Sequence, residues 1–203
     1  GAVFFHLSSR VREAHLNDVN SNLVELYLDV RDRLPDLVRR LRVLAGPGAN
    51  TKDVFYRRRE EYNRLVDAPP STARSALFLY LNRTCYNGLY RVNSRGRFNV
   101  PFGRYSKPRI LDEDRLRRAG QALGKARNIR ALPFDDFLRD TCRAGDLVYL
   151  DPPYAPVSAT ADFTTYSRCA FTADDQQRLA HVLAELHRRG VRWLLSNSYT
   201  PFT

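Results

Sequence analysis

The alternation of short apolar runs with helix-periodic segments limits the folds open to this chain more than any other feature. Four runs are too short for helices and are predicted to be strands: Ala14 to Asp18, Ile129 to Leu132, Leu147 to Leu150 and Val191 to Leu195. Strands that alternate with helices favour an α/β fold with a mostly parallel sheet covered on both faces.

Six further segments have the 3.6-residue apolar period of helices, and one long segment lacks any period. The helices are predicted at Val3 to Leu7, Leu23 to Val30, Pro35 to Leu44, Asp53 to Val66, Thr72 to Leu81 and Asp174 to Arg189. Between Arg83 and Arg109, Gly, Asn, Pro and aromatic residues replace the pattern. We therefore expect an irregular, helical insert to interrupt the sheet.

The composition indicates a folded, basic protein. With 203 residues, 43% of them hydrophobic, the chain can bury a real core, which argues against disordered and fibrous classes. Its formal net charge of +11 favours a polyanionic partner, because clustered Lys and Arg neutralise phosphates and release counterions. Charge alone does not separate nucleic acid from an acidic membrane.

The sequence lacks a membrane-spanning segment and a regular cysteine pattern, and both absences limit the class of protein that it can be. No apolar run approaches the roughly 18 residues that span a bilayer, so we expect a soluble, non-secreted protein. Cys85, Cys142 and Cys169 are odd in number and far apart. That spacing favours buried reduced thiols over a disulfide framework or a zinc site, and we expect no metal.

The sharpest short motif is Asp151-Pro152-Pro153-Tyr154, which directly follows the predicted strand Leu147 to Leu150. Ligands of open parallel sheets bind outside the carboxyl ends of the strands, where this motif is placed. The prolines stiffen the loop, since each fixes its own backbone and restrains the residue before it.

A stiff loop of this kind suits chemistry on the exocyclic amine of adenine, which is a poor nucleophile because its lone pair is shared with the ring. Asp151 and the Pro152 carbonyl can accept the two hydrogens of that amine, which frees the lone pair to attack an electrophilic methyl group, while Tyr154 stacks on the base. The alternative is an ordinary strand-to-loop turn with a capping aspartate.

The sequence around the motif resembles the Dam family of adenine-specific DNA methyltransferases, whose catalytic motif is Asp-Pro-Pro-Tyr. The resemblance covers nearly the whole chain, and it implies a Rossmann-like, S-adenosylmethionine-dependent methyltransferase sheet with a mostly helical DNA-recognition insert. It is carried by Tyr80 to Arg83, Tyr86 to Leu89, Asn93 to Tyr105, Tyr154 to Pro156, Ser158 to Phe163, Phe171-Thr172 and Gln176-Gln177.

The same resemblance divides the chain into three parts. Residues 1–50 and 119–203 would form the methyltransferase domain, and residues 51–118 the DNA target-recognition insert with its hairpin loop. Most of the family's glycine-rich cofactor loop would precede Gly1 and its closing strands would follow Thr203, so we expect the chain to be a fragment.

Five residues are candidates for binding S-adenosylmethionine by this resemblance. Gly1 would be the last glycine of the cofactor loop, where backbone must approach the ligand closely. Asp18, at a strand end, suits the ribose hydroxyls, although a helix cap ahead of Asn20 and Ser21 explains it equally well. Asp136 and Phe137 would contact the adenine moiety, and Asp151 would lie beside the reacting groups.

The insert is expected to read DNA. Its basic residues between Arg83 and Arg109 occur without any Asp or Glu, whereas a solvated face normally mixes signs. By resemblance, Tyr86 and Asn87 would fill the gap left by a flipped adenine, Leu89 and Pro101 would touch base edges, and Arg91 would bind a guanine. Packing inside the insert is the alternative for Tyr86 and Leu89. The remaining predicted DNA contacts are Asn93, Arg95, Asn99, Arg104 and Lys107, of which Arg95, Arg104 and Lys107 suit phosphates.

Taken with the resemblance, these features predict methyl transfer from S-adenosylmethionine to adenine in double-stranded DNA, at GATC or a close relative. We expect a monomer in the bacterial cytoplasm, associated with the nucleoid. Two alternatives stay open. One is a methyltransferase for RNA or protein amides, which commonly has Asn in place of Asp151, and the other is a non-catalytic DNA-binding remnant.

Overall fold

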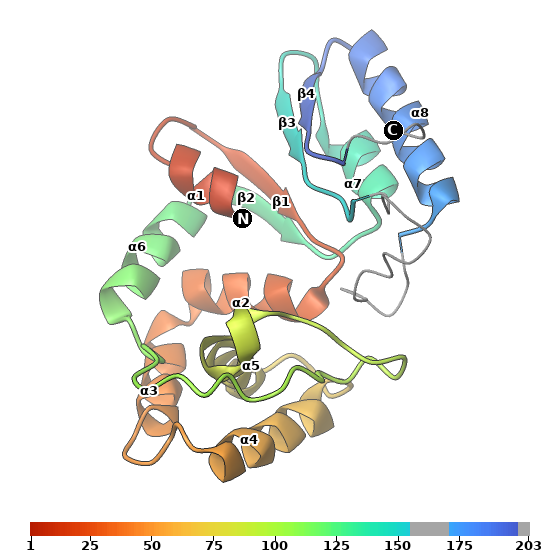
Figure 1. The fold of residues 1–203 in the computed structure, drawn as a ribbon. Helices are drawn as coiled ribbons and strands as arrows, with labels where there is room; N and C mark the ends of the chain where they lie inside the picture. The colour runs from red at the N-terminus through yellow and green to blue at the C-terminus, as the bar shows by residue number, and fades with distance from the viewer. Residues whose placement is uncertain (155–170, 199–203) are drawn as a thin grey trace. The chain divides into compact units, whose positions relative to one another are not determined.

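The computed structural model describes residues 1–154 and 171–198 and contains two compact units (Figure 1). The first unit spans Gly1–Ala131, and the second begins at Leu132. Among the described residues no helix is long and apolar enough to cross a membrane.

The first unit is mainly helical, with one pair of strands. Strands β1 and β2 are parallel, and their register pairs Leu16 with Ile129. The whole helical insert lies between them in sequence, as expected for a parallel connection. The elements are α1 (Ala2–Leu7), β1 (Ala14–Asn17), α2 (Ser21–Asp32), α3 (Leu34–Leu44), α4 (Lys52–Leu65), α5 (Thr72–Thr84), the 3-10 turn η1 (Tyr86–Gly88), α6 (Glu113–Leu123) and β2 (Ala126–Arg130).

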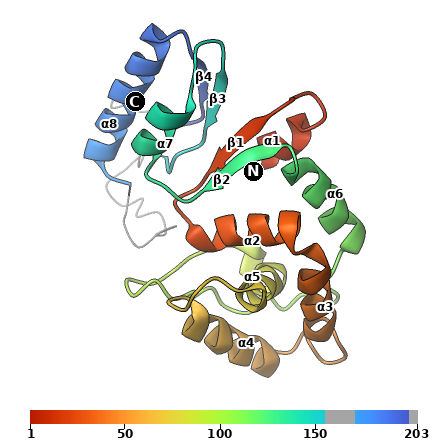
Figure 2. The same ribbon diagram turned by 180° about the vertical axis from the view of Figure 1, so that it is seen from behind.

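Helix α5 is the centre of the first unit and lies between α2 and α4 in both views (Figures 1 and 2). It is buried on most of its surface, including Leu77, Tyr80 and Leu81, because helices contact it from several sides. Leu37 and Phe55, from α3 and α4, are fully buried against this core.

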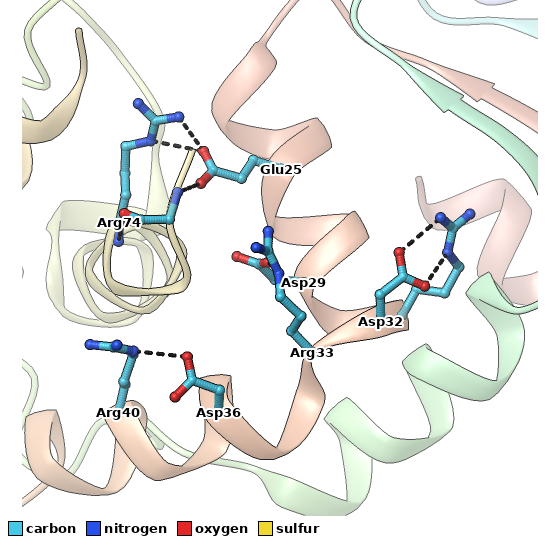
Figure 3. A network of polar contacts seen from close by, with 9 residues as sticks. Glu25, Asp29, Asp32, Arg33, Asp36, Arg40 and Arg74 are labelled. Carbon is cyan, nitrogen blue, oxygen red and sulfur yellow. Dashed lines mark hydrogen bonds and ion pairs between the residues drawn. The ribbon is translucent and has the colours of Figure 1, made fainter. Parts of the chain in front are cut away.

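A buried ion pair joins α2 to α5 (Figure 3). Glu25 accepts hydrogen bonds from the guanidinium of Arg74, one of them from Nε at 2.8 Å, and from the backbone N–H of Ser71. Both side chains are 6% exposed, and Arg74 also donates to the carbonyls of Leu65, Val66 and Ala68. A pair satisfied in this way fixes the loop between α4 and α5 against α2.

The described part of the second unit contains one strand pair and two helices: α7 (Phe134–Thr141), β3 (Leu147–Leu150), α8 (Ala173–Arg188) and β4 (Arg192–Leu195). Strands β3 and β4 are parallel, with Leu150 opposite Leu195. Helix α8 begins with a capping box, in which Thr172 and Asp175 bond each other's backbone N–H. Its buried face, which includes Leu179, Val182 and Leu186, packs with Leu150 and Val191.

The structure confirms the predicted α/β content, the parallel pairing of strands and the irregular segment after α5. The expected strand at Ile129 to Leu132 lies earlier, at β2, because pairing with β1 begins at Ala126 and α7 begins after Pro133. Helices α6 and α7 were not predicted. Both have short apolar faces, and in α6 only Leu123 is buried.

Candidate functional site

The motif Asp151 to Tyr154, called here the catalytic-motif loop, leaves β3 beside the end of β4. The N–H of Ser196 donates to the Leu150 carbonyl at 2.9 Å, so both strands end at the same level. This places the loop at the carboxyl edge of the pair, the expected position of ligand-binding loops in parallel sheets.

Three polar side chains from elsewhere in the second unit hold the loop. Gln176 of α8 donates from Nε2 to the Pro153 carbonyl at 3.1 Å, and Asn197 donates to Oε1 of Gln176 at 3.1 Å. The hydroxyls of Tyr154 and Ser196 are 2.6 Å apart and share a hydrogen bond. Our sequence reasoning gave none of these three supporting residues a role in the site, although Gln176 belongs to the segment that carries the resemblance.

The carboxylate of Asp151 is the exposed group on this supported loop. Among the described residues no hydrogen bond or ion pair to it is recorded, in contrast to Pro153 and Tyr154. Pro152 is half-buried, and Tyr154 is 53% exposed, so its ring is available for stacking. The arrangement offers a carboxylate and an aromatic face on a stiff backbone.

In the first unit, Gly1 and Asp18 both lie near Tyr27 of α2. A Cβ at position 1 would collide with the Tyr27 hydroxyl, so a larger residue here would require the Tyr27 side chain to shift. Burial and then the charge of Asp18 raise the pKa of Tyr27, which places the carboxylate within electrostatic reach of that hydroxyl. The structure thus gathers two predicted cofactor residues around one tyrosine.

Asp18 does not cap α2. Asn20 is the N-cap, and its Oδ1 accepts from the N–H groups of Asn22 at 3.1 Å and Leu23 at 3.3 Å. Asp18 instead accepts from the N–H of Asn20 at 2.8 Å through Oδ1. The helix-cap alternative for Asp18 is therefore wrong, and its carboxylate shapes the turn between β1 and α2.

The other two predicted cofactor residues belong to the second unit. Asp136 is exposed in the first turn of α7, whereas Phe137 is 7% exposed. A ring buried to this extent has little surface free for stacking on adenine, so the conformation described here favours Asp136 over Phe137 as a contact. Their roles stay predictions.

The segment Leu89 to Gly103, called here the recognition hairpin, follows α5 and η1. Isolated antiparallel bridges join Val92 to Phe98 and Cys85 to Phe102. Asn63 of α4 clamps the hairpin, because its side chain donates to the Phe98 carbonyl at 3.1 Å and accepts from the Phe98 N–H at 2.8 Å. Arg59 adds a bond to the Val100 carbonyl at 3.2 Å.

Most predicted DNA contacts lie on the surface of this region. Tyr86 is 53% exposed and Leu89 48%, which contradicts the alternative that these two side chains pack inside the insert. Asn87 and Arg104 have left-handed backbone conformations, with φ of 52° and 56°, as tight turns require. The exposed set also includes Pro101, Arg95 and Lys107.

The remaining three predicted DNA contacts also bond within the hairpin. Arg91 donates from Nε to Oδ1 of Asn99 at 2.7 Å, which fixes its guanidinium. Oδ1 of Asn93 accepts from the N–H groups of Arg95 and Arg97, each at 3.0 Å, and closes the turn. Part of the polar surface assigned to DNA is thus also structural.

A basic cavity of about 440 Å³ lies beside η1. Its described lining contains no Asp or Glu, and burial followed by repulsion from Arg115 lowers the pKa of Arg83. The lining residues are Asn82, Arg83, Asn87, Gly88, Tyr105, Ser106, Lys107, Pro108 and Arg109. The sequence shows that the charged residues of this segment are all basic. It does not show that Arg83, Asn87 and Arg109 line the same cavity.

Of the three cysteines, Cys85 and Cys142 are buried free thiols, as predicted, and Cys169 lies outside the described residues. Burial raises the pKa of Cys85 to about 11. A thiol of this kind stays protonated at neutral pH and is a poor nucleophile.

Comparison with known proteins shows which family the chain belongs to. A family model for D12 class N6 adenine-specific DNA methyltransferases matches residues 1–203. The DNA adenine methylase of Serratia marcescens is 46% identical over 192 residues, which cover 93% of this chain and 68% of that protein. The DNA adenine methylase of Escherichia coli K12 is 42% identical over 100% of this chain and 70% of its own length.

A type II methyltransferase is also similar. The type II methyltransferase M.MjaIII of Methanocaldococcus jannaschii is 38% identical over 98% of this chain and 71% of its own length. The chain belongs to the family of D12 class N6 adenine-specific DNA methyltransferases. Within that family it is a DNA adenine methyltransferase of the Dam type.

Proposed function

We propose that this enzyme transfers a methyl group from S-adenosylmethionine to the exocyclic amine of adenine in double-stranded DNA, at GATC or a closely related site. The observation that carries the proposal is the exposed Asp151 carboxylate on a loop whose neighbouring polar groups are held by Gln176 and Ser196. Preorganised acceptors of this kind lower a barrier because they need no rearrangement during the reaction.

In this mechanism, Asp151 and the Pro152 carbonyl accept the two hydrogens of the adenine amine. Its lone pair is then withdrawn from the ring and directed at the methyl carbon. Tyr154 stacks on the extruded base, a common means of holding flipped bases. The N–C bond that forms would replace the S–C bond of the donor, with S-adenosylhomocysteine as the second product, and the proton lost from the amine goes to the Asp151 carboxylate or to water.

The residues of the first unit suit a methyl donor. S-adenosylmethionine supplies an electrophilic methyl group when it is bound. The close approach at Gly1, which a Cβ would block, and the Asp18 carboxylate near Tyr27 fit a backbone-lined ribose and methionine site. We assign Gly1 and Asp18 to the donor, in a Rossmann-like sheet, and by the resemblance also Asp136 of the second unit.

The recognition hairpin and the basic cavity supply the DNA surface in this proposal. Tyr86, Asn87, Leu89 and Pro101 present exposed side chains to bases, and the fixed guanidinium of Arg91 suits a bidentate bond to guanine. The exposed Arg95, Arg104 and Lys107 suit phosphates, which set register. We retain residues 51–118 as the recognition insert of the methyltransferase domain.

Transfer of labelled methyl from S-adenosylmethionine to matched duplexes tests the proposal. One duplex contains GATC and the other has the same bases in a different order, and adenine labelling is read after digestion. We expect labelling of the GATC duplex by the unaltered protein and none by Asp151→Ala. Methylation of RNA or protein without any on DNA would overturn the proposal, as would DNA binding without donor binding.

A further inference from the structure

Two side-chain amides form a continuous hydrogen-bonded chain beside the catalytic-motif loop. The N–H of Ser198 donates to Oδ1 of Asn197 at 2.9 Å, and Nδ2 of Asn197 donates to Oε1 of Gln176 at 3.1 Å. Nε2 of Gln176 then donates to the Pro153 carbonyl at 3.1 Å. All these groups belong to the second unit, and both amides are half-buried. The chain of bonds thus connects the segment after β4, through α8, to the loop that carries Asp151.

The two ends of this chain of bonds fix the direction of every bond in it. A backbone N–H can only donate, and a carbonyl can only accept. The Pro153 carbonyl therefore requires the NH2 end of the Gln176 amide, which turns Oε1 toward Asn197. The Ser198 N–H requires Oδ1 of Asn197, which turns the NH2 of Asn197 toward Gln176. The two requirements agree, so each amide has one orientation that satisfies both of its neighbours.

The orientation of the Gln176 amide reaches Tyr154 through a peptide bond. The Pro153 carbonyl and the Tyr154 N–H belong to one planar peptide unit, so a bond to that oxygen restrains the plane from which the tyrosine projects. The Tyr154 hydroxyl is held in turn, 2.6 Å from the hydroxyl of Ser196. The side chain is thus restrained at its backbone and at its tip, although it is 53% exposed.

We infer that Asn197 is a positioning residue, which selects the end of the Gln176 amide that meets the Pro153 carbonyl and so sets how Tyr154 presents its ring to the extruded adenine. The inference rests on the proposed function, in which Tyr154 stacks on that base. Asn197 acts through Gln176, and its effect depends on the direction in which its amide donates.

Asn197→Asp separates this direction from packing. A carboxylate has nearly the shape of the carboxamide and still accepts from the Ser198 N–H, but it cannot donate to Oε1 of Gln176. It would draw the NH2 of Gln176 toward itself and turn Oε1 against the Pro153 carbonyl, so that two acceptors face each other. Asn197→Ala deletes one bond and leaves Gln176 able to keep its orientation. The isosteric change is therefore expected to be the more damaging one, the reverse of what a packing role predicts.

Single-turnover methyl transfer at saturating GATC duplex is the first measurement, in the full chain. We expect the rate to fall about thirtyfold in Asn197→Asp and about threefold in Asn197→Ala, the effects of an unsatisfied acceptor and of one lost hydrogen bond. Gln177→Glu controls for the added charge, because it places a carboxylate on the exposed surface of α8 next to Gln176, and its rate should stay near normal. A smaller loss in Asn197→Asp than in Asn197→Ala would overturn the inference.

The pH dependence tests the missing donor directly. Protonation converts the introduced carboxylate into a group that can donate to Oε1 of Gln176 while its other oxygen accepts from Ser198. The rate of Asn197→Asp relative to the unaltered protein should therefore rise as the pH falls from about 7.5 toward about 5, nearer the carboxyl range. Dividing by the rate of the unaltered protein removes the titration of Asp151, which both proteins share. A ratio that does not change with pH would contradict the inference.

A second substitution should suppress the first. Gln176→Ala removes the amide that Asn197→Asp would turn, so the double variant should react about threefold faster than Asn197→Asp alone. A double variant slower than both single variants would show that Asn197 acts by another route.

The last measurement needs neither donor nor DNA. The carbonyl 13C resonance of Pro153 reports hydrogen bonding to its oxygen, and it should shift in Asn197→Asp but not in Gln177→Glu. An unchanged resonance in Asn197→Asp would reject the orienting role of Asn197 and leave the proposed function intact. Failure of the unaltered protein to methylate DNA would instead reject the proposed function, and with it the role given to the Tyr154 ring.

Discussion

The catalytic-motif loop and the recognition hairpin are both irregular in backbone, yet they use their polar side chains in opposite ways. In the loop, Gln176 and Ser196 hold the backbone and Tyr154 from outside, and none of the residues that the structure describes bonds to the Asp151 carboxylate. In the hairpin, Asn93 and Asn99 bond within the hairpin itself. A catalytic loop needs a reactive side chain that is free to bind substrate on a rigid backbone. A DNA-recognition surface can instead use some of its polar side chains to stabilise its own conformation.

The largest effect is expected at the open carboxylate. Asp151→Asn should lower kcat for methyl transfer about a thousandfold, because an amide oxygen accepts a hydrogen less strongly than a carboxylate and an NH2 donor group replaces the second acceptor oxygen. DNA affinity should stay the same. Asp174→Asn, an exposed carboxylate in the first turn of α8, is the control. Near-normal turnover in Asp151→Asn would mean that the loop positions the base without acting on its amine.

The next effect concerns the buried ion pair between α2 and α5 rather than the surface of the hairpin. Glu25→Gln should lower the free energy of unfolding by about 3 kcal/mol, because it leaves Arg74 buried without its counter-charge. Urea denaturation measures the change. In Glu60→Gln, whose carboxylate is 69% exposed and 3.8 Å from Arg64, no measurable change is expected. Equal stability in the two variants would show that the carbonyls around Arg74 suffice.

The clamp on the hairpin can be removed separately. Asn63→Ala deletes both bonds to Phe98, so the free energy of unfolding should fall by about 2 kcal/mol and DNA affinity about tenfold. Arg64→Ala, the exposed neighbour on the same helix, should change neither stability nor affinity beyond a small loss of charge. Fluorescence anisotropy with a labelled duplex gives the affinity. Normal DNA binding by Asn63→Ala would show that the hairpin keeps its shape without α4.

Much of the fold could be predicted because its signals are local. The apolar period of α2 and α8 and the short apolar runs at β1 and β3 depend only on residues that are close in sequence. Helices α6 and α7 were missed although both are amphipathic, because each has few large apolar side chains: Leu116 and Leu123 in α6, and Phe134, Phe137 and Leu138 in α7. The start of β2 was missed because pairing with β1, rather than local apolarity, determines it.

In the candidate site, too, the residues defined by local sequence could be predicted and those defined by distant contacts could not. Asp151 could be found from the sequence because a four-residue motif and its strand define it. Its support could not, since Gln176 is 23 residues from Pro153 and Ser196 is 42 from Tyr154. Asp18 was placed at the correct strand end, but the competing cap assignment was resolved only by the bonds of Asn20.

The smallest effect tests whether the support of the catalytic-motif loop matters as much as the comparison with the hairpin implies. Gln176→Ala removes the bond to the Pro153 carbonyl, and kcat should fall about tenfold while DNA affinity is unchanged, because a loosened loop spends less time in the reactive arrangement. Gln177→Ala is the matched control, since this neighbour on α8 is exposed. Single-turnover methyl transfer at saturating duplex separates kcat from binding. If both variants react at the normal rate, the two prolines alone hold the loop, and outside polar support is a feature of the hairpin, which Asn63 clamps, and not of the loop.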